Sequence, residues 1–194
     1  MDIKLFSDAI DALEKVGKAL VHLTNVPKEQ RQRYVKAVGE AFGLLDSALM
    51  LVINRLGDIS QITDQNEFLT ELARLNNVKE WTAIERDVRL CRNLRLAHAE
   101  LDTFTLHFMA EIKGADWENV RRLVDQVLER EGQLADFIAA SLNDLAARAA
   151  SARTDQTKYS QAQGAVEQVS NVVKQERRRL IAAELQFLEE AMAA

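Results

Sequence analysis

Residues 117–150 read WENVRRLVDQVLEREGQLADFIAASLNDLAARAA, and this stretch decides the fold because its apolar residues recur every three to four positions. That spacing places them on one face of an α-helix. At about 1.5 Å per residue the helix is roughly 50 Å long, and Asp116 is placed to cap its N-terminus. The residues that carry the pattern are Val120, Leu123, Val127, Leu134, Phe137, Ile138, Leu142 and Leu145. An apolar face of this length is best buried against other long helices.

The same period appears along almost the whole chain, whereas strict alternation of apolar and polar residues is absent at useful length. Pro27 suits the first turn of a helix, where its missing N–H is not needed. The other expected helices run from Leu5 to about Thr24-Asn25, from Pro27 to about Leu56 with Gly57-Asp58 as the stop, from Asp64 to Leu75, from Lys79 to Phe108 or Ile112, and onward from a polar connection over Ser151 to Ser160.

The composition supports the same fold class. The chain of 194 residues has only 7 Gly and 1 Pro, which leaves room for few turns. We therefore expect an all-α protein, an antiparallel bundle of about five to six helices without a sheet. Its length fits a single domain over residues 1–194, with a core over about 27–150 and a C-terminal helix over about 156–193.

The charge and the cysteine count restrict the location and the partners. A net charge of −5 makes a wide, sequence-independent nucleic-acid surface a poor expectation, although a small basic cleft is compatible with it. The single Cys91 fits a reducing compartment. We see neither an apolar run of about 18 residues nor a signal peptide, so we expect a cytoplasmic protein that does not contact a membrane.

The strongest functional signal is the stretch Arg92-Asn93-Leu94-Arg95-Leu96-Ala97-His98 within the expected fourth helix. A guanidinium binds phosphate bidentately, and an imidazole moves protons near neutral pH. These two groups are what a ribonuclease without a metal requires. The alternative interpretation of Arg92 and Arg95 is a pair of surface cations, each bound to a nearby acid.

The motif has a geometric constraint. On a continuous helix Arg92 lies about 120° around and roughly 9 Å along the axis from His98, so one helix does not readily aim both side chains at one phosphate. Arg95, His98 and Asp102 instead share one line beside an apolar stripe. Either the helix bends between Arg92 and His98, or two copies of the motif meet across a two-fold interface.

This stretch resembles the R-x4-6-H signature of the HEPN (higher eukaryotes and prokaryotes nucleotide-binding) superfamily, in which Asn93 matches the polar residue that usually follows the Arg. The resemblance implies a homodimer that cleaves RNA without a metal or cofactor, in phage defence or a toxin–antitoxin system with an antitoxin or regulatory partner. It implies that His98 moves the proton and that Arg92 stabilises the phosphate charge. A Tyr that one branch of the family places two residues after the His is Glu100 here, which makes regulation by tyrosine modification unexpected.

Two acids are expected to support the motif. Asp46 interrupts an apolar face of the second helix and needs a partner, for which we expect Arg92 or Arg95. A solvent-exposed helix edge is the alternative for Asp46. Asp102 lies one turn after His98, at a spacing that also permits a purely structural pair between them.

Other kinds of site find no support. The sequence has no E-x-x-H, H-x-x-x-H, C-x-x-C or Gly-rich phosphate loop, so we expect no metal or nucleotide cofactor. Residues 177–179 are three consecutive arginines, which suit contact with RNA or acidic lipid but more often form a solvated face. Besides the ribonuclease, two functions stay open: an inactive HEPN-like dimer that binds a nucleotide or protein, and a plain helical interaction protein.

Overall fold

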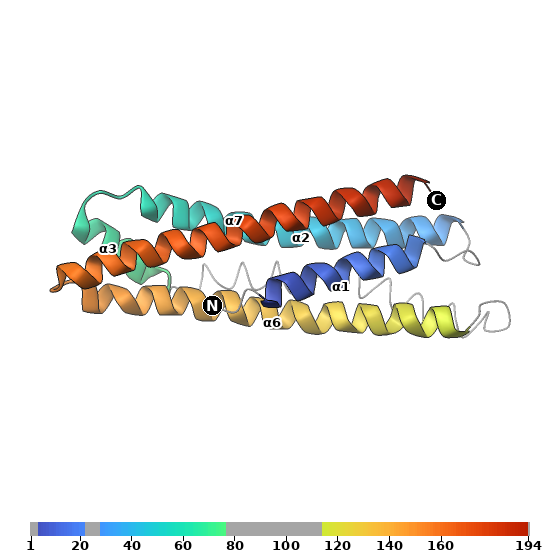
Figure 1. Cartoon of the computed structure of the whole chain (residues 1–194), viewed down its shortest axis with the longest axis horizontal. Coiled ribbons are helices and arrows are strands. Elements are labelled where there is room, and N and C mark those ends of the chain that lie inside the picture. Colours follow the sequence, from blue (N-terminus) through green and yellow to red (C-terminus); the bar gives the residue numbers. More distant parts are fainter. Residues whose placement is uncertain (1–3, 22–27, 77–113, 194) are drawn as a thin grey trace.

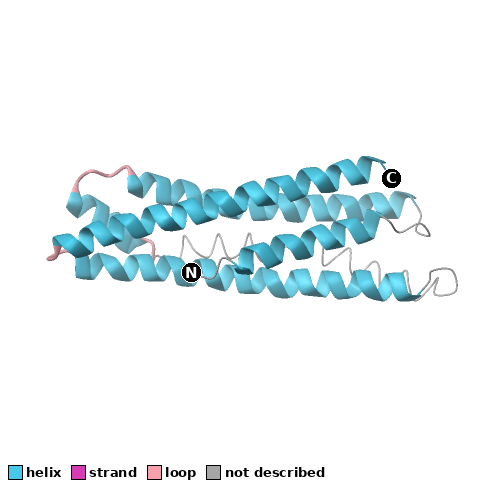
Figure 2. Ribbon diagram, in the orientation of Figure 1, coloured by secondary structure: helices cyan, strands magenta, loops and turns pink. Residues whose placement is uncertain are grey.

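The protein is described here from a computed structural model, which covers residues 4–21, 28–76 and 114–193. Within these ranges the chain forms helices and no strand, so the predicted all-α bundle is confirmed (Figures 1 and 2). The helices are α1 (Lys4–Val21), α2 (Lys28–Ser60), α3 (Gln65–Arg74), α6 (Gly114–Ala152) and α7 (Gln156–Ala193). The expected helix from Lys79 to Phe108 or Ile112 lies outside the described residues.

The long helices lie nearly parallel to one axis (Figure 1). The two helices α6 and α7 form an antiparallel hairpin, α2 packs antiparallel to α7, and α1 packs against both α6 and α7. The short helix α3 follows α2 and packs against α6 near the turn of that hairpin. The end of α1, the start of α2 and the end of α7 therefore meet at the opposite end of the bundle (Figure 1).

Two predicted helix boundaries were wrong. Helix α2 continues through Gly57 to Ser60, because the next turn buries Ile59 completely in the core. Helix α6 begins at Gly114, so Asp116 lies inside its first turn and not at the cap. The polar connection expected over Ser151 to Ser160 is limited to residues 153–155, whereas α7 (Gln156–Ala193) has the range predicted for the C-terminal helix, about 156–193.

Two aspartates explain where the helices begin. The carboxylate of Asp155 accepts hydrogen bonds from the backbone N–H groups of Thr157 at 2.9 Å and Lys158 at 3.2 Å, and so starts α7. The carboxylate of Asp64 accepts from the backbone N–H of Glu67 at 2.8 Å and starts α3 as predicted. In both cases a carboxylate also lies favourably at the positive end of the helix dipole.

The core is tightest where α1, α2 and α7 meet. The Phe187 ring is fully buried and stacks on Phe42 with ring centroids 5.9 Å apart. Gly17 of α1 also lies against this ring, and an added Cβ there would clash with it. Gly17 therefore permits α1 to lie directly against the Phe187 ring, at a distance that no larger residue allows.

Helix α2 also meets, over Arg31–Ser60, the length and hydropathy test for a membrane span, which the sequence analysis did not expect. This finding is weak evidence, since the core helix of a soluble bundle meets the same test. In this structure α2 buries Phe42, Leu49 and Leu56 against its neighbours. That packing accounts for the buried part of its apolar surface.

We predict that Gly17→Ala destabilises the protein by about 1–3 kcal/mol, because the ring of Phe187 must shift in a packed core. Gly164→Ala is the matched control, since Gly164 also lies inside a helix and a Cβ there meets no described atom within 4 Å. That control should gain about 0.5–1 kcal/mol from helix propensity. Urea denaturation of both variants measures the difference, and equal stability would contradict the close contact.

Candidate functional site

The motif that carries the functional prediction lies outside the part of the chain that the structure describes. This applies to Arg92, Asn93, Arg95, His98 and Asp102. Of the predicted site residues, the structure describes Asp46, and the roles of the others stay predictions. Two ion pairs join α7 to its neighbours, one to α2 and one to α1.

Asp46 lies half-buried on α2, and its partner among the described residues is Arg177 of α7. The Nε atom of Arg177 lies 2.7 Å from Oδ1 of Asp46, and Nη2 donates a hydrogen bond to Oδ2 over 3.2 Å. The prediction that this carboxylate has a charge partner is confirmed. The cation differs from the expected Arg92 or Arg95, because the long antiparallel contact of α2 with α7 brings Arg177 alongside.

A second carboxylate shares this neighbourhood. Glu184 lies two turns after Arg177 on α7, on the side that faces α2. Partial burial raises the pKa of its carboxyl above the ordinary value, and the charge of Asp46 raises it further. The Arg177 guanidinium thus pairs directly with Asp46, and Glu184 is a second acid close to that pair.

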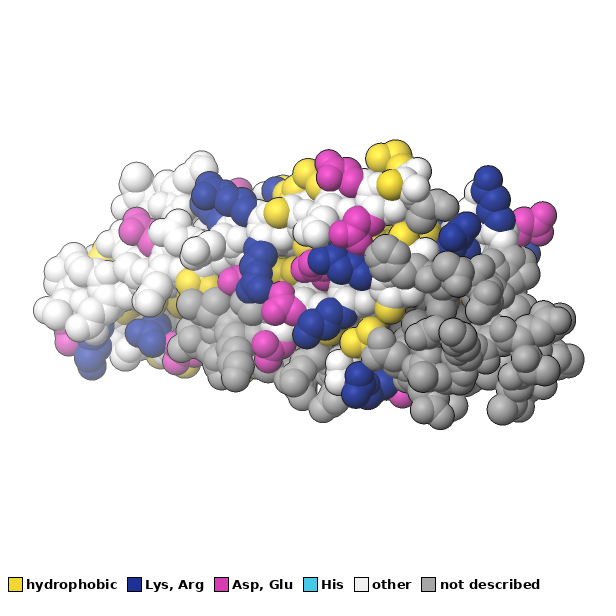
Figure 3. All heavy atoms as spheres, turned by 45° about the vertical axis from the view of Figure 1, so that its right-hand side comes forward, with side chains coloured by type: hydrophobic (Ala, Val, Ile, Leu, Met, Phe, Trp, Pro, Cys, Tyr) yellow, Lys and Arg dark blue, Asp and Glu magenta, His cyan; other side chains and the backbone are white. Residues whose placement is uncertain are grey.

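The opposite side of α7 carries an ion pair to α1. Nη2 of Arg179 donates to Oδ1 of Asp11 over 2.7 Å. Two of the three consecutive arginines therefore bind acids of neighbouring helices, and Arg178 between them is exposed. Figure 3 shows cations and acids interleaved along the bundle surface, with apolar side chains among them. Arg178 and Arg179 are exposed, as the interpretation as a solvated face implies, and Arg177 and Arg179 in addition pair with acids of neighbouring helices. Contact of these arginines with RNA stays a prediction.

Glu176 is an acid that sequence reasoning missed. Its side chain is only 5% exposed, and its Oε2 atom has no hydrogen-bond partner among the described residues. Burial raises the pKa of its carboxyl, Asp11 adds to that rise, and the nearby Arg179 opposes it. A signal was present in the sequence: Glu176 falls on the apolar stripe of α7, midway between Val173 and Leu180.

We predict that Glu176 makes the bundle less stable as pH rises. Its pKa in the fold is above the ordinary 4.5, so the folded state holds the proton more tightly than the unfolded state. The contribution of protonated Glu176 to the free energy of unfolding is fully present below pH 4.5, and it is lost as pH rises through the pKa that Glu176 has in the folded state. Glu176→Gln should therefore become more stable relative to wild type between pH 4.5 and neutral pH.

Unfolding free energies measured in urea from pH 4 to pH 8 test this prediction. Glu167→Gln is the matched control, because Glu167 lies exposed on the same helix. Its stability should track that of the wild type across the range. If the difference in unfolding free energy between Glu176→Gln and wild type is also the same at every pH, the buried carboxyl of Glu176 does not make stability depend on pH.

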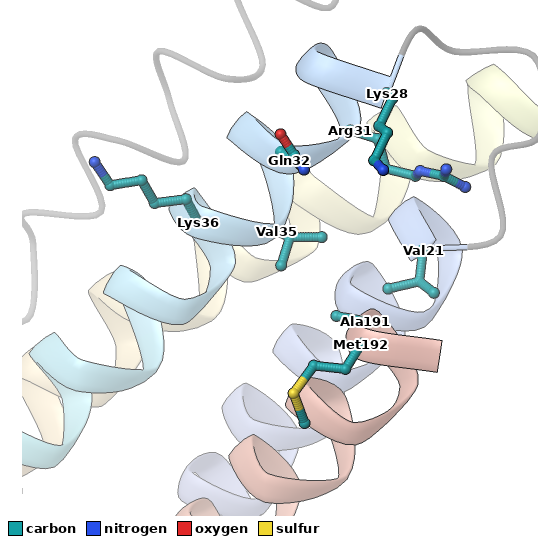
Figure 4. A pocket seen from close by; sticks show the side chains of 8 residues that line it. All are labelled: Val21, Lys28, Arg31, Gln32, Val35, Lys36, Ala191 and Met192. Carbon is teal, nitrogen blue, oxygen red and sulfur yellow. The ribbon is translucent and has the colours of Figure 1, made fainter. Parts of the chain in front are cut away.

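The structure also contains an open pocket that the sequence analysis did not predict. It lies where α1 ends, α2 begins and α7 ends, and its volume is about 480 Å³ (Figure 4). Lys28 and Arg31 of α2 stand on one side, and Val21 of α1 and Met192 of α7 form apolar parts of the wall. The sequence signal was a Lys and an Arg three residues apart in the first turn after Pro27.

The described residues offer no group of three or more His, Cys, Asp and Glu side chains that could hold a metal ion. No family model, curated protein or solved structure matches the chain. The chemistry must therefore be argued from the residues themselves.

Proposed function

We propose that the protein is a metal-independent endoribonuclease of HEPN type that acts as a dimer in the cytoplasm, in phage defence or a toxin–antitoxin system. The observation that carries the proposal is the stretch Arg92-Asn93-x4-His98 in a helical chain. The all-α bundle is the fold that this resemblance implies, and it supports the proposal to that extent.

The chemistry needs two groups. His98 takes the proton from a ribose 2′-OH as that oxygen attacks the adjacent phosphate. The bond from phosphorus to the 5′-oxygen of the next nucleotide breaks, and the leaving oxygen takes up a proton from water. Arg92 stabilises the charge that develops on the phosphate, and Asn93 and Arg95 add donors to the same phosphate. The products are a 2′,3′-cyclic phosphate and a free 5′-OH. Asp102 is placed one turn after His98 to hold its imidazole.

Asp46 has a different place in this proposal from the one the sequence suggested. Its carboxylate binds Arg177, so it supports the contact of α2 with α7. The phosphate-binding arginines of the motif do not require it. The proposed site therefore rests on the motif residues alone.

We predict a two-fold dimer whose interface includes the segment over residues 84–108. One continuous helix separates Arg92 from His98 by about 120°, and a second copy of the motif supplies the missing group across an isologous interface. Size-exclusion chromatography with light scattering at micromolar concentration measures the mass. A monomer of 21.9 kDa would contradict the composite site.

We predict that the purified protein cleaves single-stranded RNA in the presence of EDTA and spares DNA, which lacks the attacking 2′-OH. His98→Ala should abolish cleavage and keep RNA binding. Arg92→Ala should reduce both, since the guanidinium contacts the phosphate. Gel assays with end-group analysis measure the cleavage, and filter binding measures the affinity.

Matched controls are available for both residues. His107→Ala replaces a histidine outside the motif, and Arg153→Ala replaces an exposed arginine in the turn between α6 and α7. Both should cleave like wild type. An inactive wild type, together with lower melting temperatures for the Arg92 and His98 variants, would assign the motif a structural role.

One observation favours the alternative of an interaction protein. Leu185, Leu188 and Met192 are 57%, 38% and 80% exposed and lie at i, i+3 and i+7 of α7. This spacing puts them on one side of the helix, as in a surface that receives a partner helix. An inactive HEPN-like dimer would use such a surface without cleaving RNA, and the cleavage assay separates the two functions.

A further inference from the structure

The pocket at the end of the bundle has the form of a small-ligand site. Its volume of about 480 Å³ falls in the range of small-molecule pockets, roughly 300–1,000 Å³. The consecutive helices α1 and α2 and the distant helix α7 contribute to it, which makes its shape a property of the fold (Figure 4). It is lined by Val21, Lys28, Arg31, Gln32, Val35, Lys36, Ala191 and Met192.

The charge of this pocket is positive in a protein whose net charge is −5. Lys28 and Arg31 form no ion pair or hydrogen bond with the described residues, in contrast to Arg177 and Arg179, which bind acids. They are three residues apart on α2 and therefore neighbours on its surface. In Figure 4 their side chains end near one another, whereas Lys36 points away from them.

The rest of the lining is apolar or neutral. Lys36 is held only loosely by Glu40 at 3.8 Å, and the residues that line the pocket in the described ranges include no acid. Val35 and Ala191 are half-buried, and Met192 is 80% exposed although it is a large apolar side chain. Methionine adapts its shape to flat or irregular apolar groups. One side of the pocket thus attracts an anion while the other offers an apolar surface.

We propose that this pocket binds a phosphate ester of nucleotide size. The phosphate lies between Lys28 and Arg31, where a guanidinium and an ammonium match its charge and its oxygens. The base lies on Val35 and Met192, and the Gln32 amide is within the lining to receive its polar edge. The first turn of α2 adds the positive end of its dipole to the same place.

The nucleotide unit has two sources, a free mononucleotide or one nucleotide of an RNA strand. The second source rests on the proposed ribonuclease function, whereas the first does not. Binding is measured apart from cleavage by using the full-length His98→Ala protein, so failure of the pocket and failure of the enzyme are distinguishable.

Isothermal titration of this protein with adenosine 5′-monophosphate, inorganic phosphate and adenosine tests the site. The monophosphate should bind at least tenfold more tightly than either fragment, since only it uses both walls. Lys28→Gln and Arg31→Gln should each weaken it by about tenfold or more, the effect of losing one charge-assisted contact. Lys174→Gln and Arg178→Gln, which remove exposed cations elsewhere on α7, should leave it unchanged.

A short single-stranded RNA separates the sources. RNA binding that weakens with Lys28→Gln and Arg31→Gln assigns the pocket to the strand, and monophosphate binding without that effect assigns it to a free nucleotide. No monophosphate binding, binding that ignores both pocket variants, or phosphate alone binding as tightly as the monophosphate would overturn the proposal. Circular dichroism of each variant confirms that the helices are intact.

Discussion

The architecture depends on one contact, that of the Phe187 ring of α7 with Gly17 of α1 and Phe42 of α2. Three helices meet there at a distance that a glycine alone permits. At the other end of α7, Tyr159 packs edge-on against Phe68 of α3 with ring centroids 5.4 Å apart. Aromatic pairs of this kind contribute about 0.5–1.5 kcal/mol beyond their buried area. Helix α7 is therefore the element through which the other helices are organised.

The charged residues of α7 follow from that central place. Arg177 and Arg179 are two residues apart, so their side chains leave α7 on different sides and reach α2 and α1 respectively. Each ion pair joins helices that are far apart in sequence. Glu176 is the exception, because it lies on the core side without such a partner among the described residues. An unpaired buried carboxylate lowers stability at neutral pH.

The helices could be predicted from the sequence because an apolar period of 3.6 is a local signal, and so could the start of α3 at Asp64. The end of α2 could not, since it depends on Ile59 finding a place in the core. Gly17 looks like an ordinary helix-weakening residue until Phe187, 170 positions away, is placed beside it. The prediction of Arg92 or Arg95 as the partner of Asp46 was wrong for the same reason. That this carboxylate needs a cation is a local signal, but which cation it meets depends on how α2 packs against α7.

The residues proposed to be functional divide in the same way. The proposed Arg92 and His98 motif is read from a short stretch of sequence, but whether both side chains reach one phosphate depends on a bend or a two-fold interface that this stretch does not fix. The pocket beside Lys28 and Arg31 exists only because the ends of α1 and α7 meet the start of α2. Its cations are visible in the sequence, but part of its apolar wall, Ala191 and Met192, comes from more than 150 positions away.

A double-mutant cycle on Phe42→Leu and Phe187→Leu tests the central claim most directly, with unfolding free energies from urea denaturation. Since the two rings stack in the fold, the cycle should give a coupling energy of about 0.5–1.5 kcal/mol. Additive effects, within about 0.3 kcal/mol, would contradict the account in which Phe187 joins α7 to α2.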